Sequence, residues 1–376
     1  MPGPERASRG EARAGAVLEI DLDCIAENWK RLVERLNPGA GIAAVVKADA
    51  YGLGMAKVAP KLAASGCELF FVATLEEGIA LRKLLPSTQI GVFNGVFKAT
   101  AGPMRRARLI PVLNDLGQLA FWRAQAKDEP LAAMIHVDTG MARLGFPAVE
   151  LAKLVNNTSD LLGNVEIKVV MSHLACADDP QNPLNAQQLA ALQAAARRLP
   201  PALVSIAASS GIFLGPEYHL DFVRPGAALY GVNPTPGQPN PMLQVVRLKG
   251  RIVQVRDVDS GITVGYGAAH RMERPGRVAT VSVGYADGWL RSSSHRGSAS
   301  IAGQRVPIIG RISMDLLSLD VTGIDPALVR PGNFVDLLDA TYGVDHVAAA
   351  AGTIGYEILT ALGRRYHRVY RSNSAG

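Results

Sequence analysis

The chain has 376 residues, of which 48% are hydrophobic and 19% are charged, and its net charge is +6 at pH 7. This composition is typical of a soluble globular protein with room for more than one domain. The basic residues are spread along the sequence and form no basic face interleaved with aromatic residues. Nucleic-acid binding is therefore disfavoured, whereas an anionic small ligand is compatible with the charge.

Three cysteines, Cys24, Cys67 and Cys176, lack the spacing of a disulfide framework or a zinc site. We therefore expect a reducing compartment and no bound metal. No apolar run is long enough to span a membrane, and residues 1–15 lack the apolar core of a secretory signal. The sequence thus predicts a cytoplasmic protein, not associated with a membrane, whose first 15 residues are a short disordered leader.

Strand-like and helix-like segments alternate from residue 17 onward. An extended entry at residues 18–22 precedes a helix at 24–36. Eight strands are predicted at residues 42–46, 69–73, 89–92, 110–113, 132–137, 165–171, 203–207 and 227–230. Amphipathic helices are predicted between them at residues 55–64, 75–84, 116–126, 148–156 and 185–199. Repeats of about 25 to 30 residues predict an N-terminal (β/α)8 TIM-type barrel over residues 16–241, with a doubly wound α/β sheet as the alternative.

The pattern changes at residues 233–241, where the Pro-rich segment N-P-T-P-G-Q-P-N-P fits neither a helix nor a central strand. Beyond this connector, short strands are predicted at residues 243–255, 278–283, 298–301, 306–309, 316–321 and 334–338. Helices are predicted only near residues 346–352 and 354–362. Residues 242–376 are therefore expected to form a C-terminal, mostly-β domain.

Lys47 lies in the segment V-V-K-A-D-A-Y-G-L-G, directly after a predicted buried strand. In an α/β barrel, reactive groups are presented at the carboxyl ends of the strands. A partly desolvated lysine at such a place can form a Schiff base with a carbonyl cofactor. A solvated lysine at a strand end is the alternative that this segment alone leaves open.

Further polar motifs follow later strands of the predicted barrel. D-T-G-M-A-R-L-G places Arg143 after the fifth strand, and S-H-L-A places His173 after the sixth. A-S-S-G at residues 208–211 follows the seventh strand and suits a phosphate, and R-P-G-A adds Arg224 and a glycine turn. Each residue alone could be structural, as a core histidine or a salt-bridged arginine. Their joint occurrence at strand ends favours an active site there.

The motifs together resemble those of alanine racemase. The resemblance rests on A-V-V-K-A-D-A-Y-G-L-G, G-M-A-R-L-G, S-H-L-A, V-R-P-G-A-A-L-Y-G, V-G-Y-G, G-Y-A-D-G and S-M-D-L. These motifs have that family's order and spacing from about residue 17 to Tyr370. The lysine motif is typical of pyridoxal-phosphate enzymes on this barrel, and V-G-Y-G and G-Y-A-D-G narrow the resemblance to the racemases.

The resemblance implies two catalytic residues. Lys47 would hold pyridoxal 5'-phosphate as a Schiff base and act as the base on the D-side of the substrate α-carbon. Tyr266, in V-G-Y-G of the second domain, would be the base on the L-side, supplied across the interface of a homodimer. Racemisation needs acid–base groups on opposite faces of a planar carbanion. A tyrosine, with an ordinary pKa of about 10, needs nearby cations to act as a base.

The resemblance also implies the ligand-binding residues. The cofactor would be bound by Lys47, Tyr51, His173, Ser209, Arg224, Gly226, Ala227 and Tyr370. Arg224 would face the pyridine nitrogen, and because a guanidinium does not give up its proton, that nitrogen would stay unprotonated. Arg143 and the backbone of Met314 would bind the substrate carboxylate, and Tyr285 and Asp315 would line the entrance or lie just behind the site.

Three positions depart from the family's usual pattern. Many members have a lysine where this chain has His136, and carbamylation of that lysine supplies a negative charge beside the substrate arginine. His136 cannot carry this group, so an anion or a neighbouring carboxylate would have to orient Arg143. Ala208 replaces the asparagine that often precedes the phosphate-binding serine, and Ser313 replaces a cysteine with little expected effect.

The expected function is pyridoxal-phosphate-dependent interconversion of L- and D-alanine, which would supply D-alanine for peptidoglycan synthesis. A broad-specificity amino-acid racemase is the closest alternative. A barrel-fold decarboxylase is a weaker one, since that family is expected to pair the pyridine nitrogen with a carboxylate rather than an arginine such as Arg224. A non-catalytic pyridoxal-phosphate carrier is disfavoured because it would lack a domain such as residues 242–376.

Overall fold

The computed structural model of the protein describes residues 9–126 and 129–372. The described chain divides into two compact units. The barrel unit comprises residues 25–229 and 233–243, and the β unit comprises residues up to 24, 230–232 and those from 244 onward. Most of the predicted disordered leader, residues 1–8, lies outside the described residues. Its last part contains a short helix, α1 (Arg9–Arg13).

The barrel unit is built on a parallel sheet whose strands follow one another in chain order. They are β3 (Ala44–Val45), β4 (Leu69–Val72), β5 (Gln89–Val92), β6 (Ile110–Leu113), β7 (Leu131–His136), β8 (Val165–Met171) and β9 (Leu203–Ser205). Consecutive parallel neighbours are typical of a (β/α)8 barrel. The predicted fold class is confirmed.

A short strand, β10 (Phe222–Val223), lies between the two ends of this sheet and closes it. β10 pairs with β2 (Gly41–Ile42), which runs into β3. On its other side the Arg224 N–H donates to the Ala207 carbonyl at 2.9 Å. The eighth strand is therefore residues 222–223, and its prediction at 227–230 was wrong. Residues Ala227–Tyr230 form a 3-10 helix, η3, because a short apolar run does not distinguish the two conformations.

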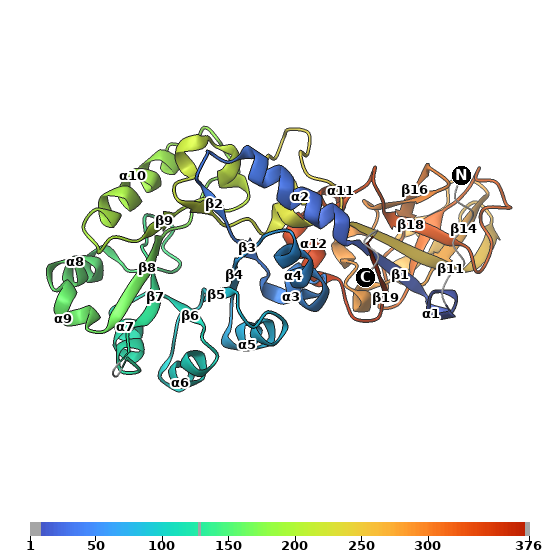
Figure 1. Cartoon of the computed structure of the whole chain (residues 1–376). Coiled ribbons are helices and arrows are strands. Elements are labelled where there is room, and N and C mark those ends of the chain that lie inside the picture. The colour runs from blue at the N-terminus through green and yellow to red at the C-terminus, as the bar shows by residue number, and fades with distance from the viewer. Residues whose placement is uncertain (1–8, 127–128, 373–376) are drawn as a thin grey trace. The chain divides into compact units, whose positions relative to one another are not determined.

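Helices connect the strands and lie on the outside of the barrel sheet (Figure 1). They are α2 (Leu22–Arg35), α4 (Met55–Ala64), α5 (Leu75–Leu84), α6 (Lys98–Arg106), α7 (Leu116–Arg123), α8 (Ala148–Asn156), α9 (Thr158–Leu162) and α10 (Leu184–Ala196). The short segment α3 (Lys47–Tyr51) follows β3 and has a left-handed backbone. The bounds of α4, α5 and α8 agree with the sequence prediction. Helix α6 was not predicted from the sequence, because its Gly102 and Pro103 are poor helix formers. Two 3-10 turns, η1 (Ser210–Phe213) and η2 (Pro216–Tyr218), precede β10.

Aromatic and aliphatic side chains fill the barrel interior. Phe71 of β4 is fully buried and stacks on Phe93 with ring centroids 4.9 Å apart. Phe222 of β10 also stacks with Phe71, with ring centroids 6.4 Å apart. The interior is thus a packed core that holds the strand ends in place, and not an open channel.

The β unit contains mainly antiparallel strands. They are β1 (Ala16–Asp21), β11 (Val246–Val258), β12 (Thr263–Val264), β13 (His270–Arg271), β14 (Gly276–Val281), β15 (Ser298–Ile301), β16 (Gln304–Ile309), β17 (Leu317–Asp320), β18 (Phe334–Leu338) and β19 (His367–Arg371). β14 pairs with both β17 and β11, so β14, β17, β16, β15, β18 and β11 close into a ring. Two helices, α11 (Val344–Ala351) and α12 (Gly355–Ala361), complete the unit with the turns η4 (Tyr266–Ala268), η5 (Tyr285–Asp287) and η6 (Arg291–Ser293).

Strand β1 belongs to the β unit, although the sequence analysis assigned residues 16–241 to the barrel. β1 pairs antiparallel with β11 and parallel with β19. Its Glu19 lies 3.1 Å from Arg371 and forms an ion pair with Lys249. These partners lie more than two hundred residues away, so local pattern could not reveal them. No helix within residues 9–126 and 129–372 is long and apolar enough to cross a lipid bilayer.

Candidate active site

Lys47 follows β3 at the carboxyl end of the barrel strands and starts α3. Its Nζ lies 5.9 Å from the centre of the Phe93 ring, which follows β5. Burial and the positive charge of Arg143 lower the pKa of Lys47, and the carboxylate of Glu77 opposes them. A larger fraction of neutral amine is therefore present than for an ordinary lysine, which favours nucleophilic chemistry.

The residues directly after Lys47 have an unusual backbone. Ala48, Asp49, Ala50 and Tyr51 have φ values of 53°, 54°, 54° and 55°, so all four are left-handed without being glycine. Each such residue costs about 1–2 kcal/mol relative to the right-handed conformation. Hydrogen bonds and burial stabilise this left-handed turn. For example, the Gly52 N–H donates to the Ala48 carbonyl at 2.7 Å. Strain of this kind is concentrated at functional sites.

Tyr51, at the end of the left-handed turn, reaches the glycine turn after β10. A Cβ atom on Gly226 would lie 2.2 Å from the Tyr51 hydroxyl oxygen, so only glycine fits this close approach. The buried Ser209 hydroxyl accepts hydrogen bonds from the N–H groups of Gly226 and Ala228, both at 3.1 Å. Its own hydrogen is left to donate. Two hydroxyls and the amino end of η3, where Ala227 lies, thus form a turn of the kind that binds phosphate.

Arg224 is a buried cation, with a side chain that is 3% exposed. Its guanidinium donates to the Ser205 hydroxyl at 2.5 Å and to the Ser172 carbonyl at 2.6 Å. Within the described part of the chain it forms no ion pair with a carboxylate. Burial lowers the pKa of Arg224 to about 10, so the group stays protonated at neutral pH. A buried, uncompensated charge is costly and suggests a role in binding an anion or an electron-rich ring.

Two histidines near these cations are neutral. His173 follows β8, and burial with the charges of Arg224 and Arg143 lowers the pKa of His173 to about 3. His136 ends β7, and the same causes lower the pKa of His136 to about 4. The charge of Lys47 also lowers the pKa of His173, so these groups lie close together at one end of the barrel unit. A neutral imidazole has one donor and one acceptor nitrogen.

A hydrogen bond defines the tautomer of His136. Its Nδ1 lies 3.1 Å from Oδ1 of the buried Asn114. The Asn114 amide nitrogen donates to the Val112 carbonyl at 2.8 Å, so the Asn114 oxygen is the acceptor of the pair. Nδ1 of His136 therefore carries the hydrogen, and Nε2 carries a lone pair that can accept a hydrogen bond from a cation.

Arg143 is exposed on a loop that runs from Asp138 to Gly145. One oxygen of Asp138 accepts N–H groups of Gly140, Met141 and Ala142 at 3.0, 3.0 and 3.1 Å. Burial raises the pKa of Asp138, but these hydrogen bonds outweigh burial and hold it below its ordinary value. The loop is closed where the Phe146 N–H donates to the His136 carbonyl at 2.7 Å. Asp138 thus determines where Arg143 is presented.

Gln188 of α10 supports the segment that carries His173. Its buried side-chain amide donates to the His173 carbonyl at 2.9 Å and accepts the Ala175 N–H at 2.8 Å. Sequence motifs did not reveal the roles of Gln188, Glu77, Asn114 and Asp138. For Glu77 a signal existed, because T-L-E-E at residues 74–77 has the spacing of a helix capping box. The contacts of Gln188 and Asn114 with the histidine segments form only in the folded barrel, whereas those of Asp138 are local, with N–H groups two to four residues further along the chain.

The remaining predicted residues lie in the β unit. Tyr266, on η4, is 71% exposed, and Tyr285 and Met314 are 43% and 54% exposed. The Tyr285 N–H donates to the Ser313 carbonyl at 3.0 Å, which holds the segments around Tyr285 and Met314 side by side. Asp315 forms an ion pair of 2.7 Å with Arg365.

Tyr370 also lies in the β unit, on β19, where it is opposite Ile20 of β1. The barrel unit thus contains Lys47, Tyr51, His136, Arg143, His173, Ser209, Arg224, Gly226 and Ala227, and the β unit contains Tyr266, Tyr285, Met314, Asp315 and Tyr370. The predicted base Tyr266 and the predicted base Lys47 therefore belong to different units.

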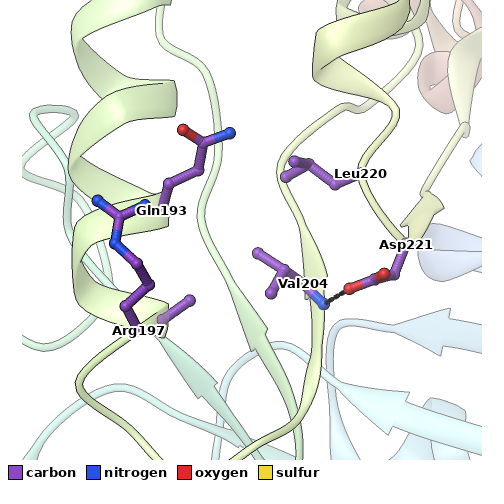
Figure 2. A pocket seen from close by; sticks show the side chains of 6 residues that line it. Gln193, Arg197, Val204, Leu220 and Asp221 are labelled. Carbon is purple, nitrogen blue, oxygen red and sulfur yellow. Dashed lines mark hydrogen bonds between the residues drawn. The ribbon is translucent and has the colours of Figure 1, made fainter.

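A pocket of about 330 Å³ lies elsewhere in the barrel unit, between the end of α10 and the start of β10. Figure 2 shows its lining side chains, among them Arg197 and Asp221. The Asp221 carboxylate is committed to the Val204 N–H at 2.7 Å. Residues before a strand and at the end of a helix lie at the amino ends of the strands, where barrel enzymes do not place their chemistry.

The donor set at the carboxyl ends fits an anionic cofactor beside a reactive lysine. Lys47, Arg143 and Arg224 supply positive charge, and Tyr51, Ser209 and the Gly226 turn form a cradle that a Cβ atom would fill. Pyridoxal phosphate has a phosphate for this cradle and a carbonyl for the lysine. Fold and site together define a lysine-centred barrel enzyme with an appended β unit.

Comparisons with known proteins give the family. A family model described as alanine racemase, N-terminal domain, matches residues 20–234, and one described as alanine racemase, C-terminal domain, matches residues 245–370. The chain belongs to the alanine racemase family, whose members are isomerases.

Individual relatives match over nearly the whole chain. A catabolic alanine racemase of Mesorhizobium japonicum is 50% identical and aligns over 96% of this chain and 94% of its own. An alanine racemase of Rhodospirillum rubrum is 49% identical over 96% of this chain and 97% of its own. The crystal structure of alanine racemase from Bartonella henselae, with covalently bound pyridoxal phosphate, has a TM-score of 0.91 and 40% identity over 95% of this chain and 100% of its own.

Proposed function

We propose that this protein interconverts L- and D-alanine with pyridoxal phosphate by a two-base mechanism. The observation that carries the proposal is the arrangement of Lys47, Arg143 and Arg224 around two neutral histidines in a chain of the alanine racemase family. When bound, pyridoxal phosphate supplies a carbonyl for the lysine and an electron-withdrawing ring that acidifies the α-C–H bond of an amino acid.

The barrel residues bind and orient this cofactor. Tyr51, Ser209 and the backbone of Gly226 and Ala227 would hold the phosphate, and the family resemblance gives Tyr370 the same role. The close approach of Tyr51 to Gly226 and the two N–H groups on Ser209 support this role.

His173 and Arg224 position the ring. Arg224 would face the ring nitrogen and keeps its own proton, because its pKa of about 10 lies well above neutral pH. The ring nitrogen would then stay unprotonated, which would weaken the ring as an electron sink and disfavour side reactions such as transamination. A barrel-fold decarboxylase is disfavoured because that family is expected to pair the ring nitrogen with a carboxylate, whereas this chain offers Arg224.

Two groups exchange protons with the α-carbon in the proposed mechanism. Lys47 acts on the D-side, and its lowered pKa supports the role because a neutral amine can accept a proton. Tyr266 acts on the L-side and is contributed by a second copy of the chain in a homodimer. The exposure of Tyr266 supports this assignment, and the β unit exposes further large apolar side chains, Ile262, Tyr285, Met314 and Leu316, that a second copy could cover.

The substrate carboxylate binds to Arg143 and to the backbone N–H of Met314. We assign the orientation of Arg143 to His136, whose Nε2 lone pair can accept a hydrogen bond from the guanidinium. A neutral acceptor would thus take the place of the negative charge found in many family members. Tyr285 and Asp315 line the entrance in this proposal, where the ion pair of Asp315 with Arg365 limits its mobility.

The proposed physiological role is supply of D-alanine for peptidoglycan synthesis in the cytoplasm. Free enantiomers have equal free energies, so a racemase drives its substrate toward equal amounts from either side. The direction of flux depends on which enantiomer is consumed, and a catabolic role, as in the name of the Mesorhizobium relative, would need the same chemistry. Complementation of a bacterium that requires D-alanine tests the biosynthetic role.

The activity itself is tested by incubating the purified protein and pyridoxal phosphate with L-alanine in deuterated water. D-alanine that carries deuterium at the α-carbon is expected, because each proton removed is replaced from solvent. Absence of both D-alanine and α-deuterium would falsify the proposal. Repeating the assay with serine, lysine and arginine separates an alanine racemase from a broad-specificity racemase, and release of carbon dioxide would instead indicate a decarboxylase.

A further inference from the structure

The side chain of Glu77 joins two loops at the carboxyl ends of neighbouring strands. Glu77 lies in the first turn of α5 and is partly buried. Its Oε1 accepts the Ala48 N–H at 2.7 Å, and its Oε2 accepts the N–H groups of Ala73 and Thr74 at 2.8 and 3.3 Å. Ala48 follows β3 and Ala73 follows β4, which pair in parallel. One carboxylate therefore fixes the loop that carries Lys47 to the loop of the next strand.

The segment that Glu77 holds is the left-handed turn from Ala48 to Tyr51. Non-glycine residues adopt this conformation only when surrounding contacts enforce it. Glu77 binds the first N–H of the turn, and Asp49 binds the Met55 N–H just beyond its end at 2.7 Å. Since Lys47 precedes the turn and Tyr51 ends it, relaxation of the turn would move both the lysine amine and the hydroxyl beside Gly226.

Glu77 also supplies negative charge to Lys47. Burial lowers the pKa of Lys47 and so does Arg143, whereas Glu77 raises it. The Phe93 ring and His173 also lie near the amine, and the pKa of His173, about 3, makes that side chain neutral. Because Glu77 Oε1 accepts a hydrogen bond from the N–H of Ala48, the residue next to Lys47, its negative charge lies close to this amine.

We propose that Glu77 is a positioning residue for Lys47, which holds the left-handed turn in place and supplies the counter-charge of the lysine ammonium. The proposal rests on the proposed function insofar as Lys47 is the reactive lysine. It concerns properties of Lys47 that can be measured without substrate or turnover. A purely structural role of Glu77, as the capping-box residue of α5 with Thr74, would stabilise the helix but leave the proton affinity of Lys47 unchanged.

Three variants separate the charge of Glu77 from its hydrogen bonds. Glu77→Gln removes the charge and places an NH2 group opposite one of the backbone N–H donors. Glu77→Asp keeps the charge but is too short to reach both loops. Glu76→Gln is the matched control, because Glu76 is exposed in the same helical turn and its loss changes net charge and helix-dipole interaction equally.

The proton affinity of Lys47 is measured by competitive labelling with trace acetic anhydride over a range of pH, followed by peptide mass spectrometry. Bound pyridoxal phosphate is first removed from the purified protein with hydroxylamine and dialysis, so that the amine is free. We expect the pKa of Lys47 to be lower in Glu77→Gln than in Glu77→Asp by roughly 0.5–1 unit, because an opposite charge nearby favours the protonated form. Glu76→Gln should match the wild type.

Hydrogen exchange at the Ala48 amide measures how readily the hydrogen bond that holds the turn opens. Loss of its charged acceptor should speed exchange about tenfold in Glu77→Gln and in Glu77→Asp, and not in Glu76→Gln. Equal Lys47 labelling curves in Glu77→Gln, Glu77→Asp and wild type would overturn the proposal that Glu77 supplies the counter-charge. Unchanged exchange at the Ala48 amide would overturn the proposal that Glu77 holds the turn in place. Either failure is distinct from failure of the proposed function, which shows as absence of racemisation in the wild-type protein.

Discussion

Replacing Gly226 with alanine perturbs the proposed phosphate cradle at one atom. The added Cβ would lie 2.2 Å from the Tyr51 hydroxyl oxygen and 2.8 Å from the ring carbon that bears it. Both spacings are shorter than van der Waals contact, so one of the two segments must move. Tyr51 cannot move freely, because its side chain is 7% exposed and its backbone belongs to the left-handed turn.

The size of the effect follows from the cost of overpacking. Forcing an extra methyl group into a packed site costs about 1–3 kcal/mol. If the displaced hydroxyl and turn bind the cofactor phosphate, this corresponds to a roughly 5- to 150-fold loss of affinity for pyridoxal phosphate. The free energy of unfolding should fall by a similar amount.

Equilibrium binding of pyridoxal phosphate to the cofactor-free protein, followed by absorbance, measures this loss. Gly102→Ala is the control, since Gly102 lies in helix α6 and its Cβ would meet only the ends of the Arg106 and Gln125 side chains, 3.3 and 3.9 Å away. Adding Tyr51→Phe to Gly226→Ala removes the nearest clashing atom and should restore part of the stability without restoring phosphate affinity. Wild-type affinity in Gly226→Ala, or no gain in stability from the second change, would refute the reasoning.

Three further predictions concern the histidines, the substrate arginine and the dimer. Folding lowers the pKa of His136 to about 4 and that of His173 to about 3, so both histidines bind protons more tightly in the unfolded chain. The free energy of unfolding is therefore highest above the unfolded-state pKa of about 6.5 and falls as the pH drops below it, by up to about 1.4 kcal/mol per pH unit for each histidine. Urea unfolding at several pH values measures this fall, and a free energy of unfolding that does not change with pH would contradict it. Asn114→Leu removes the partner that defines the His136 tautomer, so KM for alanine should rise about tenfold while cofactor absorbance is kept, and an unchanged KM would exclude this role. Mixing inactive Lys47→Ala and Tyr266→Phe chains should restore roughly a quarter of wild-type activity if each site takes one residue from each copy, whereas no recovery would indicate that both residues come from one chain.

Local sequence pattern was sufficient for much of the fold. β8, β15 and β18 have the bounds that apolar runs between turn residues predicted, and so do α4 and α8. Prediction from local sequence pattern failed where residues far apart in the chain determine the structure by pairing with one another. β1 resembles a barrel entry strand but pairs with β11 and β19, and the brief β10 is a strand only because β2 and the segment after β9 flank it.

The candidate site shows the same division. Motifs at strand ends suggested Lys47, Arg143, His173 and Arg224, and the barrel brings these four residues together. Residues that act on the site through other groups were not found this way. Asn114 contacts His136 because β6 and β7 are neighbours, and Glu77 contacts Ala48 because β3 and β4 are. Such contacts depend on strand pairing, which a single sequence does not show directly.

The central claim is that Lys47 and Tyr266 act on opposite faces of the substrate. Its most direct test is the exchange of the α-hydrogen of each alanine enantiomer in deuterated water by the Tyr266→Phe variant, loaded with pyridoxal phosphate. D-alanine should still exchange its α-hydrogen through Lys47, while L-alanine should neither exchange nor convert at more than a small fraction of the wild-type rate. Racemisation at the wild-type rate, or equal exchange of both enantiomers, would contradict the account.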